Sequence, residues 1–303
     1  MEIIYLDSSF TFKEDTVLCL GYFDGLHLGH IELIKKAKTL GKKVAILTYD
    51  ISPKQFLKKL DRKVILDDEQ RNKILSDLQV DYLLIKHFDL EYSMIDCVDF
   101  IKKIKALNVS TLVIGYDYRF GKDAKGNVET LLDYFTVIEV PCIGDENGKY
   151  STSRVFNSLE QNDLNDVNKV LGRYYSIKGK VVKGLQNGQK IGFRTANLSL
   201  TDNYYLPNGG VYACYAYVDN KQYLAMVNIG YHPSIDKLDE RIVEAHLIDF
   251  NEDIYGKEIT LDFVYFIRGE IHFLTLDQLK IQLDKDKNIV KRLLSNGKIK
   301  AKY

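Results

Sequence analysis

The sequence predicts an α/β domain with a parallel sheet, followed by an antiparallel β domain that ends in a helix. Two observations indicate this division. From Val17 to about Pro141, short apolar runs alternate with amphipathic helical segments, which is typical of β-α units around a buried parallel sheet. After about residue 172, apolar runs follow one another with Gly, Asn and Asp turns between them, which indicates an antiparallel barrel or sandwich. We therefore expect domains over 1–171 and 172–303.

Length and composition fit two ordinary domains and argue against several classes of protein. The chain has 303 residues, 46% of them hydrophobic, and its 42 Lys and Arg balance 42 Asp and Glu. This balance gives no overall positive field for nucleic acid or an anionic membrane. The four cysteines are far apart and form no C-x-x-C pair, which argues against a zinc site and a disulfide framework. Because the chain shows no signal-like N-terminus and no long apolar run, we expect a cytoplasmic protein.

The individual elements follow from the hydrophobic pattern. The first strand is the apolar run TVLCL at 16–20, and the helix after it has Ile31, Leu33, Ile34 and Ala37 at helical spacing. Further strands of the first domain are predicted at 43–49, 80–86, 109–115 and 135–140, and helices at 67–78, 94–107 and 127–134. A helix over 162–171 then precedes strands at 175–182, 211–218, 222–229, 241–250 and 258–266, and a final helix covers 276–294.

The stretch GYFDGLHLGH, Gly21 to His30, joins the first strand to the first helix. Its glycines allow the backbone to approach a ligand closely, and the free N–H groups at the start of a helix attract anions. His27 and His30 are three residues apart, so both rings can reach one face of the first helical turn. The stretch therefore predicts a nucleotide-phosphate site at the carboxyl end of the sheet, where parallel sheets bind ligands. Two ordinary surface histidines beside a turn are the alternative.

Two further segments of the first domain indicate a nucleotide site. The fourth predicted strand is followed by GYDYRFGK, which brings Asp117 and Arg119 to the same edge of the sheet. Asp117 suits a hydroxyl or a ring amide and Arg119 suits phosphate, although a turn with a solvated ion pair is the alternative. Ser151 to Arg154, STSR, offers hydroxyls and a guanidinium at a helix start, where they either bind phosphate or cap the helix.

The second domain contains a candidate metal motif and a candidate base. Gly184 to Leu198 reads GLQNGQKIGFRTANL, which indicates either a phosphate-covering loop or an ordinary glycine-rich hairpin. Thr195 and Asn197 are two apart, so on an extended strand their oxygens point to one side, which suits Mg²⁺ and phosphate. Glu244 lies in an otherwise apolar strand, where an acid costs free energy unless it is paired or used. It is the best general-base candidate for phosphoryl transfer, and an outward-facing residue paired with Lys or Arg is the alternative.

Nine segments, in one order, resemble the prokaryotic bifunctional riboflavin kinase/FMN adenylyltransferases, also called FAD synthetases. They are GYFDGLHLGH, GYDYRFGK, STSR, LGRYYSIKGKVV, GFRTANL, GGVYA, NIGYHPS, EAHLIDFNEDIYGK and FIRGE, and they span essentially the whole chain. The resemblance implies an N-terminal Rossmann-like nucleotidyltransferase domain of the HxGH class and a C-terminal riboflavin kinase barrel with a terminal helix. It implies ATP-dependent phosphorylation of riboflavin to FMN and adenylylation of FMN to FAD with release of pyrophosphate. Mg²⁺ with ATP is the implied cofactor, and flavins are substrate and product.

The resemblance also implies roles for individual residues. The HxGH motif falls on His27, Gly29 and His30, which would bind the ATP phosphates and stabilise charge on the departing pyrophosphate. Glu244 matches the base that deprotonates the ribityl 5′-hydroxyl, and Thr195 and Asn197 match the Mg²⁺/ATP motif. The other matches to the nucleotide and flavin shell are Gly21, Phe23, Asp24, Asp117, Arg119, Gly121, Ser151, Thr152, Ser153, Arg154, Lys180, Gly184, Lys190, Gly192, Asn228 and Arg268. We expect ATP, riboflavin and FMN as ligands, no nucleic acid or membrane partner, and a monomer or weak homo-oligomer.

Four positions depart from the family's pattern. Ile51 and Ser52 stand where the family has a proline and a histidine, Phe156 where it has an arginine, and Arg194 where it has a proline. The loss of one charged hydrogen bond typically costs about 1.5–3 kcal/mol. These departures leave open an enzyme that retains one activity, with the kinase as the better retained of the two. A flavin-binding or regulatory protein on an enzyme scaffold is a further alternative, as is a different HxGH nucleotidyltransferase, which would leave the second domain unexplained.

Overall fold

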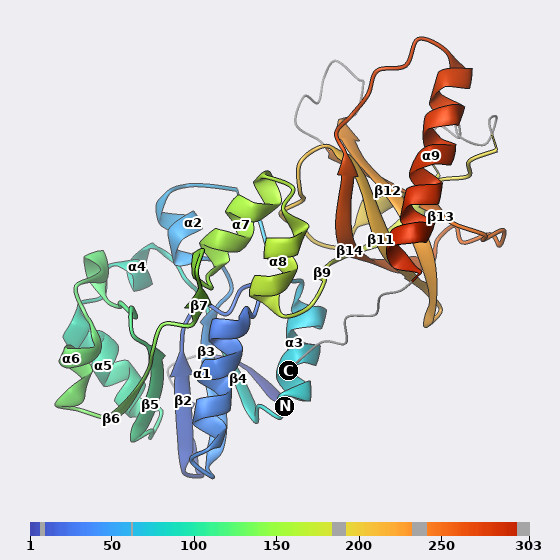
Figure 1. Cartoon of the computed structure of the whole chain (residues 1–303). Coiled ribbons are helices and arrows are strands. Elements are labelled where there is room, and N and C mark those ends of the chain that lie inside the picture. Colours follow the sequence, from blue (N-terminus) through green and yellow to red (C-terminus); the bar gives the residue numbers. More distant parts are fainter. Residues whose placement is uncertain (7–9, 62, 184–191, 232–240, 296–303) are drawn as a thin grey trace. The chain divides into compact units, whose positions relative to one another are not determined.

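The computed structural model describes residues 1–6, 10–61, 63–183, 192–231 and 241–295, with the side chain of Tyr231 excepted. The chain folds into two compact units (Figure 1). The first unit contains Met1–Lys63 and Asp68–Thr152, and the second contains Val64–Asp67 and the chain from Ser153 onward. The first unit holds a parallel sheet and the second a closed antiparallel barrel, so the predicted fold class is confirmed.

The sheet of the first unit has six parallel strands in the order β1-β4-β3-β2-β5-β6. They are β1 (Glu2–Tyr5), β2 (Thr16–Leu20), β3 (Lys43–Tyr49), β4 (Tyr82–Lys86), β5 (Thr111–Gly115) and β6 (Thr136–Val140). Every residue of β2 is buried, as expected for a central strand that is covered on both faces. Edge strand β1 was not predicted, because four residues show no clear period and its partner β4 lies far along the chain.

Short helices connect these strands. They are α1 (Leu28–Lys38), α2 (Pro53–Leu57), α3 (Asp68–Asp77), α4 (Leu90–Ser93), α5 (Cys97–Ala106), the 3-10 turn η1 (Lys122–Ala124) and α6 (Val128–Leu132), and a small hairpin of β7 (Gly144–Asp145) and β8 (Gly148–Lys149) follows β6. The predicted helix over 94–107 begins later, at Cys97, because the Asp96 carboxylate caps it by accepting a hydrogen bond from the backbone N–H of Asp99. The predicted strand over 80–86 begins later, at Tyr82. The carboxylate of Asp81, the residue before it, accepts a hydrogen bond from the backbone N–H of Val44.

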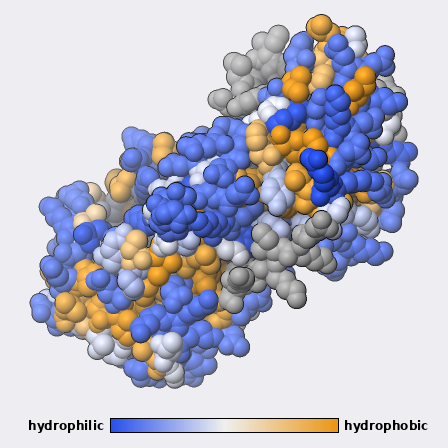
Figure 2. Space-filling model, viewed as in Figure 1, coloured by the Kyte–Doolittle hydropathy of each residue, from blue (hydrophilic) through white to orange (hydrophobic). Residues whose placement is uncertain are grey.

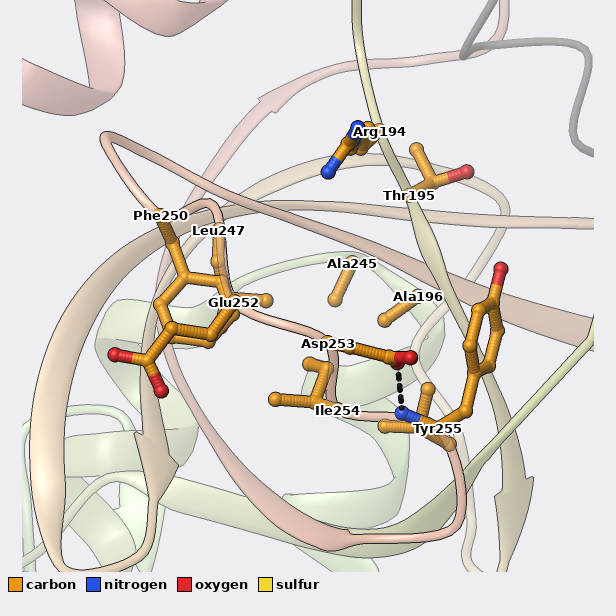
Figure 3. A pocket seen from close by; sticks show the side chains of 11 residues that line it. Arg194, Thr195, Ala196, Ala245, Leu247, Phe250, Glu252, Asp253, Ile254 and Tyr255 are labelled. Atoms are coloured by element: carbon orange, nitrogen blue, oxygen red, sulfur yellow. Dashed lines mark hydrogen bonds between the residues drawn. The ribbon is translucent and has the colours of Figure 1, made fainter.

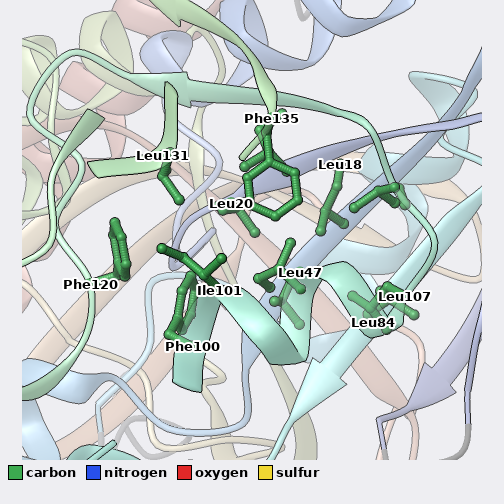
Figure 4. Packing of buried hydrophobic residues seen from close by; sticks show 14 of the residues in the cluster. Leu18, Leu20, Leu47, Leu84, Phe100, Ile101, Leu107, Phe120, Leu131 and Phe135 are labelled. Atoms are coloured by element: carbon green, nitrogen blue, oxygen red, sulfur yellow. The ribbon is translucent and has the colours of Figure 1, made fainter. Parts of the chain in front are cut away.

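One large core cluster of the first unit lies on one face of its sheet. Leucines of β2, β3 and β4 pack there against α5 and α6, as Figure 4 shows for Leu18, Leu20, Leu47, Leu84, Phe100, Ile101 and Leu131. Helix α1 packs on β2, β3 and β5, and its buried residues lie outside this cluster. Helices therefore cover both faces of the sheet.

The strand order reverses direction next to β2. From β2 the chain moves outward through β3 to β4, and it then returns to β5 on the other side of β2. In doubly wound sheets, ligands bind outside the carboxyl ends of the strands at such a switch point. The loops that follow β2 and β5 therefore flank the expected ligand crevice.

The second unit contains a closed barrel in the order β10-β13-β12-β11-β14-β9, with antiparallel pairing throughout. Its strands are β9 (Tyr175–Val182), β10 (Ala196–Leu200), β11 (Gly210–Val218), β12 (Lys221–Tyr231), β13 (Arg241–Leu247) and β14 (Glu258–Arg268). Helices α7 (Thr152–Glu160) and α8 (Leu164–Leu171) precede the barrel, and α9 (Leu276–Leu294) follows it. The predicted strand over 241–250 ends earlier, at Leu247, because the chain turns at Asp249, whose φ is +58°.

Helix α9 covers part of the outside of the barrel. Its Val290 and Leu294 are buried in a cluster with Val211 of β11 and Met226 of β12. Figure 2 shows one face of the molecule, with hydrophilic residues over most of its area and smaller hydrophobic patches. Among the described residues there is no helix with the length and apolar character that crossing a membrane requires.

Candidate functional site

The first candidate site lies where the chain leaves β2 and enters α1. His27 is the N-cap of α1, with an extended backbone (φ −65°, ψ 166°), and its Nδ1 accepts a hydrogen bond from the backbone N–H of His30 at 3.3 Å. The two imidazole rings stack, with centroids 3.7 Å apart and an interplanar angle of 22°. Both histidines therefore share one face of the first helical turn, as their spacing predicts. The first turn carries no acidic residue that would repel an anion.

Two neighbours hold the histidine pair in place. A Cβ atom on Gly29 would lie 3.0 Å from Nδ1 of His27, so a side chain there would push the His27 ring away by a few tenths of an ångström. The ring of Phe23 is completely buried, and its centroid lies 4.9 Å from that of His30. A Cβ on Gly21 would in turn meet the ring of Phe23 at 3.3 Å. The glycines of the motif thus allow these rings to pack closely.

The STSR segment meets this loop at Asp24, which is buried. The hydroxyl of Thr152 donates a hydrogen bond to the carbonyl oxygen of Asp24, with Oγ1 and O 3.3 Å apart. Thr152 is the first residue of α7, Ser151 before it is half-buried and Ser153 after it is exposed. Two motifs that are far apart in the sequence therefore come together.

The loop after β5 contributes Asp117, Arg119 and Gly121, next to the loop after β2 in the sheet order. Asp117 forms an exposed ion pair with Lys149 of β8, with Nζ and Oδ2 2.6 Å apart, and Asp117 raises the pKa of the Lys149 ammonium. Arg119 is exposed, and its Nη1 donates to the carbonyl oxygen of Tyr118. Gly121 has φ +72°, and a Cβ there would lie 3.0 Å from Sγ of Cys97. Lys149 was not predicted from the sequence, because a single charged residue outside the predicted strands and helices is not distinctive.

Three other residues of the first-domain motifs have structural partners. Arg154 donates from Nε and Nη2 to the two carboxylate oxygens of Asp166 in α8, and both side chains are mostly buried. Phe156 packs on Tyr205, with ring centroids 4.4 Å apart. Ser52 is the buried N-cap of α2, and its hydroxyl accepts a hydrogen bond from the N–H of Gln55. The Arg154 guanidinium is thus engaged within the second unit.

The second candidate site is a row of three polar side chains across the barrel. Asn197 of β10 is the Cα partner of Glu244 of β13, and Glu244 is in turn the Cα partner of Asn228 of β12. Directly opposed residues of antiparallel strands project to the same face, with Cβ atoms about 4.5–5.5 Å apart. The next residues along these strands, among them the buried Ala196 and Ala245, point into the barrel. The three polar side chains therefore lie together on its outer face.

The environment of Glu244 suits a proton acceptor. Its side chain is half-buried, and burial raises the pKa of its carboxyl above the ordinary value. Among the described residues, no Lys, Arg or His forms an ion pair with the Glu244 carboxylate. Two residues on, burial lowers the pKa of His246, whose Nδ1–H donates to the carbonyl oxygen of Arg194 at 2.8 Å.

A cavity of about 280 Å³ opens near the start of β10, on the face of Ala196 and Ala245 and not on that of the polar row (Figure 3). Arg194 and Thr195 line one side of it, and Ile254 lies across from them. Polar and apolar atoms contribute about equally to its wall, and the remaining lining residues are Val181, Ala196, Ala245, Leu247, Phe250, Glu252, Asp253 and Tyr255. The sequence reading identified Thr195 but missed the loop from Phe250 to Tyr255, because acidic turns of this kind are common between strands. The cavity is large enough for part of a nucleotide and too small for a whole one.

The remaining predicted residues of the second domain lie apart from the cavity lining. Arg268 ends β14 and forms an ion pair with the fully buried Asp286 of α9. Lys180 is exposed on β9, and Gly192 has φ +84° with open space around its Cβ position. Gly184 and Lys190 lie outside the described residues. The described residues contain no cluster of three or more His, Cys, Asp or Glu that would hold a metal by itself.

Comparisons with known proteins match both halves of the chain. A family model described as riboflavin kinase matches residues 171–294, and one described as FAD synthetase matches residues 9–154. The bifunctional riboflavin kinase/FMN adenylyltransferase of Listeria monocytogenes is 32% identical over 94% of this chain and 96% of that protein. The enzyme of the same name from Bacillus subtilis is 33% identical over 93% of each chain. A crystal structure of a macrolide-efflux protein from Streptococcus pneumoniae, 32% identical, has a TM-score of 0.90 and covers 96% of this chain and 99% of that one.

Proposed function

The chain belongs to the family of bifunctional riboflavin kinase/FMN adenylyltransferases, and on this premise we propose which of its residues carry the two reactions. It is an enzyme with both activities, which phosphorylates riboflavin to FMN and adenylylates FMN to FAD. The alternative of one retained activity is not favoured, because matches to the families of both activities are found. No efflux role is proposed from the Streptococcus pneumoniae protein, whose likeness we use for the fold alone.

The row of Asn197, Glu244 and Asn228 is the observation that supports the kinase assignment most strongly. A half-buried carboxylate with a raised pKa, flanked by two amides, is suited to accept the proton of a substrate hydroxyl. We assign Glu244 as the base for the ribityl 5′-hydroxyl of riboflavin, whose oxygen then attacks the γ-phosphorus of ATP. The cavity lined by Thr195 would hold the adenine end of the nucleotide among its apolar side chains, and Arg268 would contact the flavin.

The donor set at the start of β10 fits Mg²⁺ carried by ATP. Thr195 and Asn197 offer neutral oxygen ligands, and Mg²⁺ commonly takes one or two protein oxygens together with substrate phosphates and water. When bound, the ion would neutralise charge on the phosphates during transfer. Asn197 would thus face both the metal and Glu244, which ties the position of the base to that of the nucleotide.

In the first unit, we assign His27 and His30 to the ATP phosphates. The start of α1 presents backbone N–H groups and a positive dipole end to an anion, and the stacked rings add further hydrogen-bond donors. The phosphate of FMN would attack the α-phosphorus in line, and pyrophosphate would leave toward the histidines. This chemistry needs positioning and charge stabilisation and no covalent intermediate. Asp24, Asp117, Arg119 and the hydroxyls of 151–153 would complete the nucleotide shell.

The domain boundary, the ligands, the cellular location and the oligomeric state are further parts of the proposal. We propose that the functional boundary lies between 171 and 172, that ATP, riboflavin and FMN are the ligands, and that the enzyme acts in the cytoplasm as a monomer or weak homo-oligomer. Lys180, Gly184, Lys190 and Gly192 would cover the nucleotide phosphates of the kinase site.

Two variants, each assayed in both half-reactions, test the assignments. Glu244→Gln should abolish FMN formation from riboflavin while FAD formation from supplied FMN persists. His30→Ala should reduce FAD formation from FMN and leave FMN formation unchanged. If either variant lost both activities equally while its thermal unfolding stayed that of the parent, the two-site assignment would be wrong.

A further inference from the structure

A buried carboxylate lies at the end of the kinase row, on α9. Asp286 is fully buried in this otherwise amphipathic helix, and it receives hydrogen bonds on both oxygens. Nε and Nη2 of Arg268 donate to Oδ2 at 3.0 and 2.8 Å, and Nε2 of Gln282 donates to Oδ1 at 2.8 Å. A buried charge is tolerated when it is paired and hydrogen-bonded in this way.

The other end of this contact lies in the same row as the candidate base, three strands away from Glu244. Val211 of β11 is the Cα partner of Asn228 on one side and of Arg268 on the other. Arg268 therefore continues the row of Asn197, Glu244 and Asn228 on the outer face of the barrel, one strand beyond Val211. Its guanidinium places a positive charge in the same row as these three polar side chains.

Hydrogen bonds fix the orientation of this guanidinium. Of its five N–H donors, two go to Asp286 and one goes from Nη1 to the carbonyl oxygen of Gly269 at 2.9 Å. The other two hydrogens, one on each Nη, take no part in these three hydrogen bonds. A planar guanidinium held on one edge loses little further freedom when its other edge binds a ligand.

Docking of α9 alone does not require this pair. Val290 and Leu294 already anchor the helix in the apolar cluster with Val211 and Met226. A buried ion pair stabilises a protein weakly, and apolar residues of similar volume often do as well or better. The pair is therefore better explained by the orientation that it gives to Arg268.

We propose that Asp286 is a positioning residue for riboflavin phosphorylation, which holds Arg268 so that two of its N–H groups face a carbonyl or hydroxyl oxygen of the flavin. This inference rests on the proposed contact between Arg268 and the flavin. Because Asp286 neutralises Arg268, the pair presents directed donors with no net charge, which suits uncharged riboflavin. Gln282, one turn earlier in α9, donates a hydrogen bond to the carboxylate.

The test uses the full-length enzyme with saturating Mg·ATP and varied riboflavin. Asp286→Asn should raise the KM for riboflavin about tenfold or more, the usual effect of losing one charged hydrogen bond. The KM for ATP in the kinase reaction and FAD formation from supplied FMN should stay at parental values. Asp284→Asn is the matched control, because Asp284 is exposed on the same helix, and it should change none of these quantities.

A double-mutant cycle separates positioning from a merely structural role. If Asp286 acts through Arg268, the double variant Arg268→Ala/Asp286→Asn should have the same riboflavin KM as Arg268→Ala alone. An additive KM increase in the double variant, or an Asp286→Asn effect that falls equally on the KM for ATP, would overturn the positioning role. If Asp286→Asn does not fold, Gln282→Met keeps the ion pair and should give a smaller rise in riboflavin KM; no rise would count against the proposal.

The same measurements distinguish failure of the premise from failure of the inference. If Arg268→Ala leaves the riboflavin KM unchanged, the proposed flavin contact of Arg268 is wrong. If Arg268→Ala raises that KM and Asp286→Asn does not, the contact stands and the positioning role of Asp286 is wrong.

Discussion

His27 and His30 form a stacked pair at the start of α1, in which the ring of His27 accepts a hydrogen bond from the backbone of His30. The pair depends on Gly29, because any side chain there would press on the His27 ring. The geometry of the proposed adenylyl-transfer site is therefore set by Gly29 as much as by the histidines themselves.

Gly29→Ala should impair FAD formation selectively. Its Cβ would lie 3.0 Å from Nδ1 of His27, so the ring must move away from the helix start. Since small displacements of a catalytic group are costly, we expect a loss of about tenfold or more in kcat/KM for FAD formation from FMN. FMN formation from riboflavin, measured on the same preparation, should be unchanged. Glu32→Ala, at an exposed position of the same helix, is the control, and an equal loss in both variants would refute this account.

As pH falls, the kinase reaction should lose activity at a higher pH than it would with a base that has the ordinary pKa of glutamate. Glu244 must be ionised to accept a proton, and burial raises the pKa of its carboxyl above the usual value of about 4.3. The kcat for FMN formation should therefore fall as pH decreases, with a midpoint above about 4.3. A pH profile with saturating substrates, limited to the range in which the fold is intact, measures this midpoint. A midpoint at or below the ordinary value contradicts the role given to burial.

Tyr255→Ala should weaken ATP binding in the kinase reaction alone. Tyr255 lines the cavity beside Thr195, where an aromatic ring can pack on adenine (Figure 3). An aromatic contact contributes about 0.5–1.5 kcal/mol, so the KM for ATP in FMN formation should rise about two- to tenfold. Tyr265→Ala is a matched control, since Tyr265 is an exposed tyrosine of β14 and lies outside the cavity lining. If both variants raised this KM equally, the cavity would not be the nucleotide site.

Asp262 should make the enzyme less stable as pH rises through the weakly acidic range. Burial raises the pKa of its carboxyl to about 6, although Ser176 and Tyr217 hydrogen-bond to it. The folded chain thus keeps a proton on Asp262 that the unfolded chain, with a pKa near 3.9, has already lost. The contribution of Asp262 to the free energy of unfolding is therefore fully present below about pH 4 and is lost between about pH 4 and 6. The loss is on the order of 3 kcal/mol.

Urea unfolding of the parent and of Asp262→Asn between pH 4 and 7 measures this contribution. The variant should lack this part of the pH dependence, because an amide does not titrate. Parallel stability curves for the two proteins would show that Asp262 has an ordinary pKa.

Much of this architecture follows from short-range pattern in the sequence. The runs at 16–20, 43–49 and 175–182 are strands with the predicted bounds, and the last helix covers 276–294 as its apolar spacing indicates. Strand β1 was missed, because four edge residues whose partner is distant in sequence carry too little pattern. Strand ends are less predictable than strand centres, as the turn at Asp249 shows.

Which residues belong to the candidate sites could be predicted from the sequence, but which of them lie next to each other could not. Glu244 and Asn197 each show a local signal, yet their adjacency depends on the register between β10 and β13, which no single segment encodes. Arg154 has the chemistry of a phosphate ligand, but its carboxylate partner Asp166 becomes visible only when α7 and α8 are folded together. Asp286 shows no sequence signal, because one aspartate among the charges of α9 resembles any solvated residue.

The central claim is that one chain carries two activities in two separate sites. The most direct test is to incubate the purified enzyme with riboflavin and Mg·ATP and to resolve FMN and FAD by chromatography over time. We predict that FMN appears first and that FAD follows. Accumulation of FMN without any FAD, or no phosphorylation of riboflavin at all, would contradict the claim.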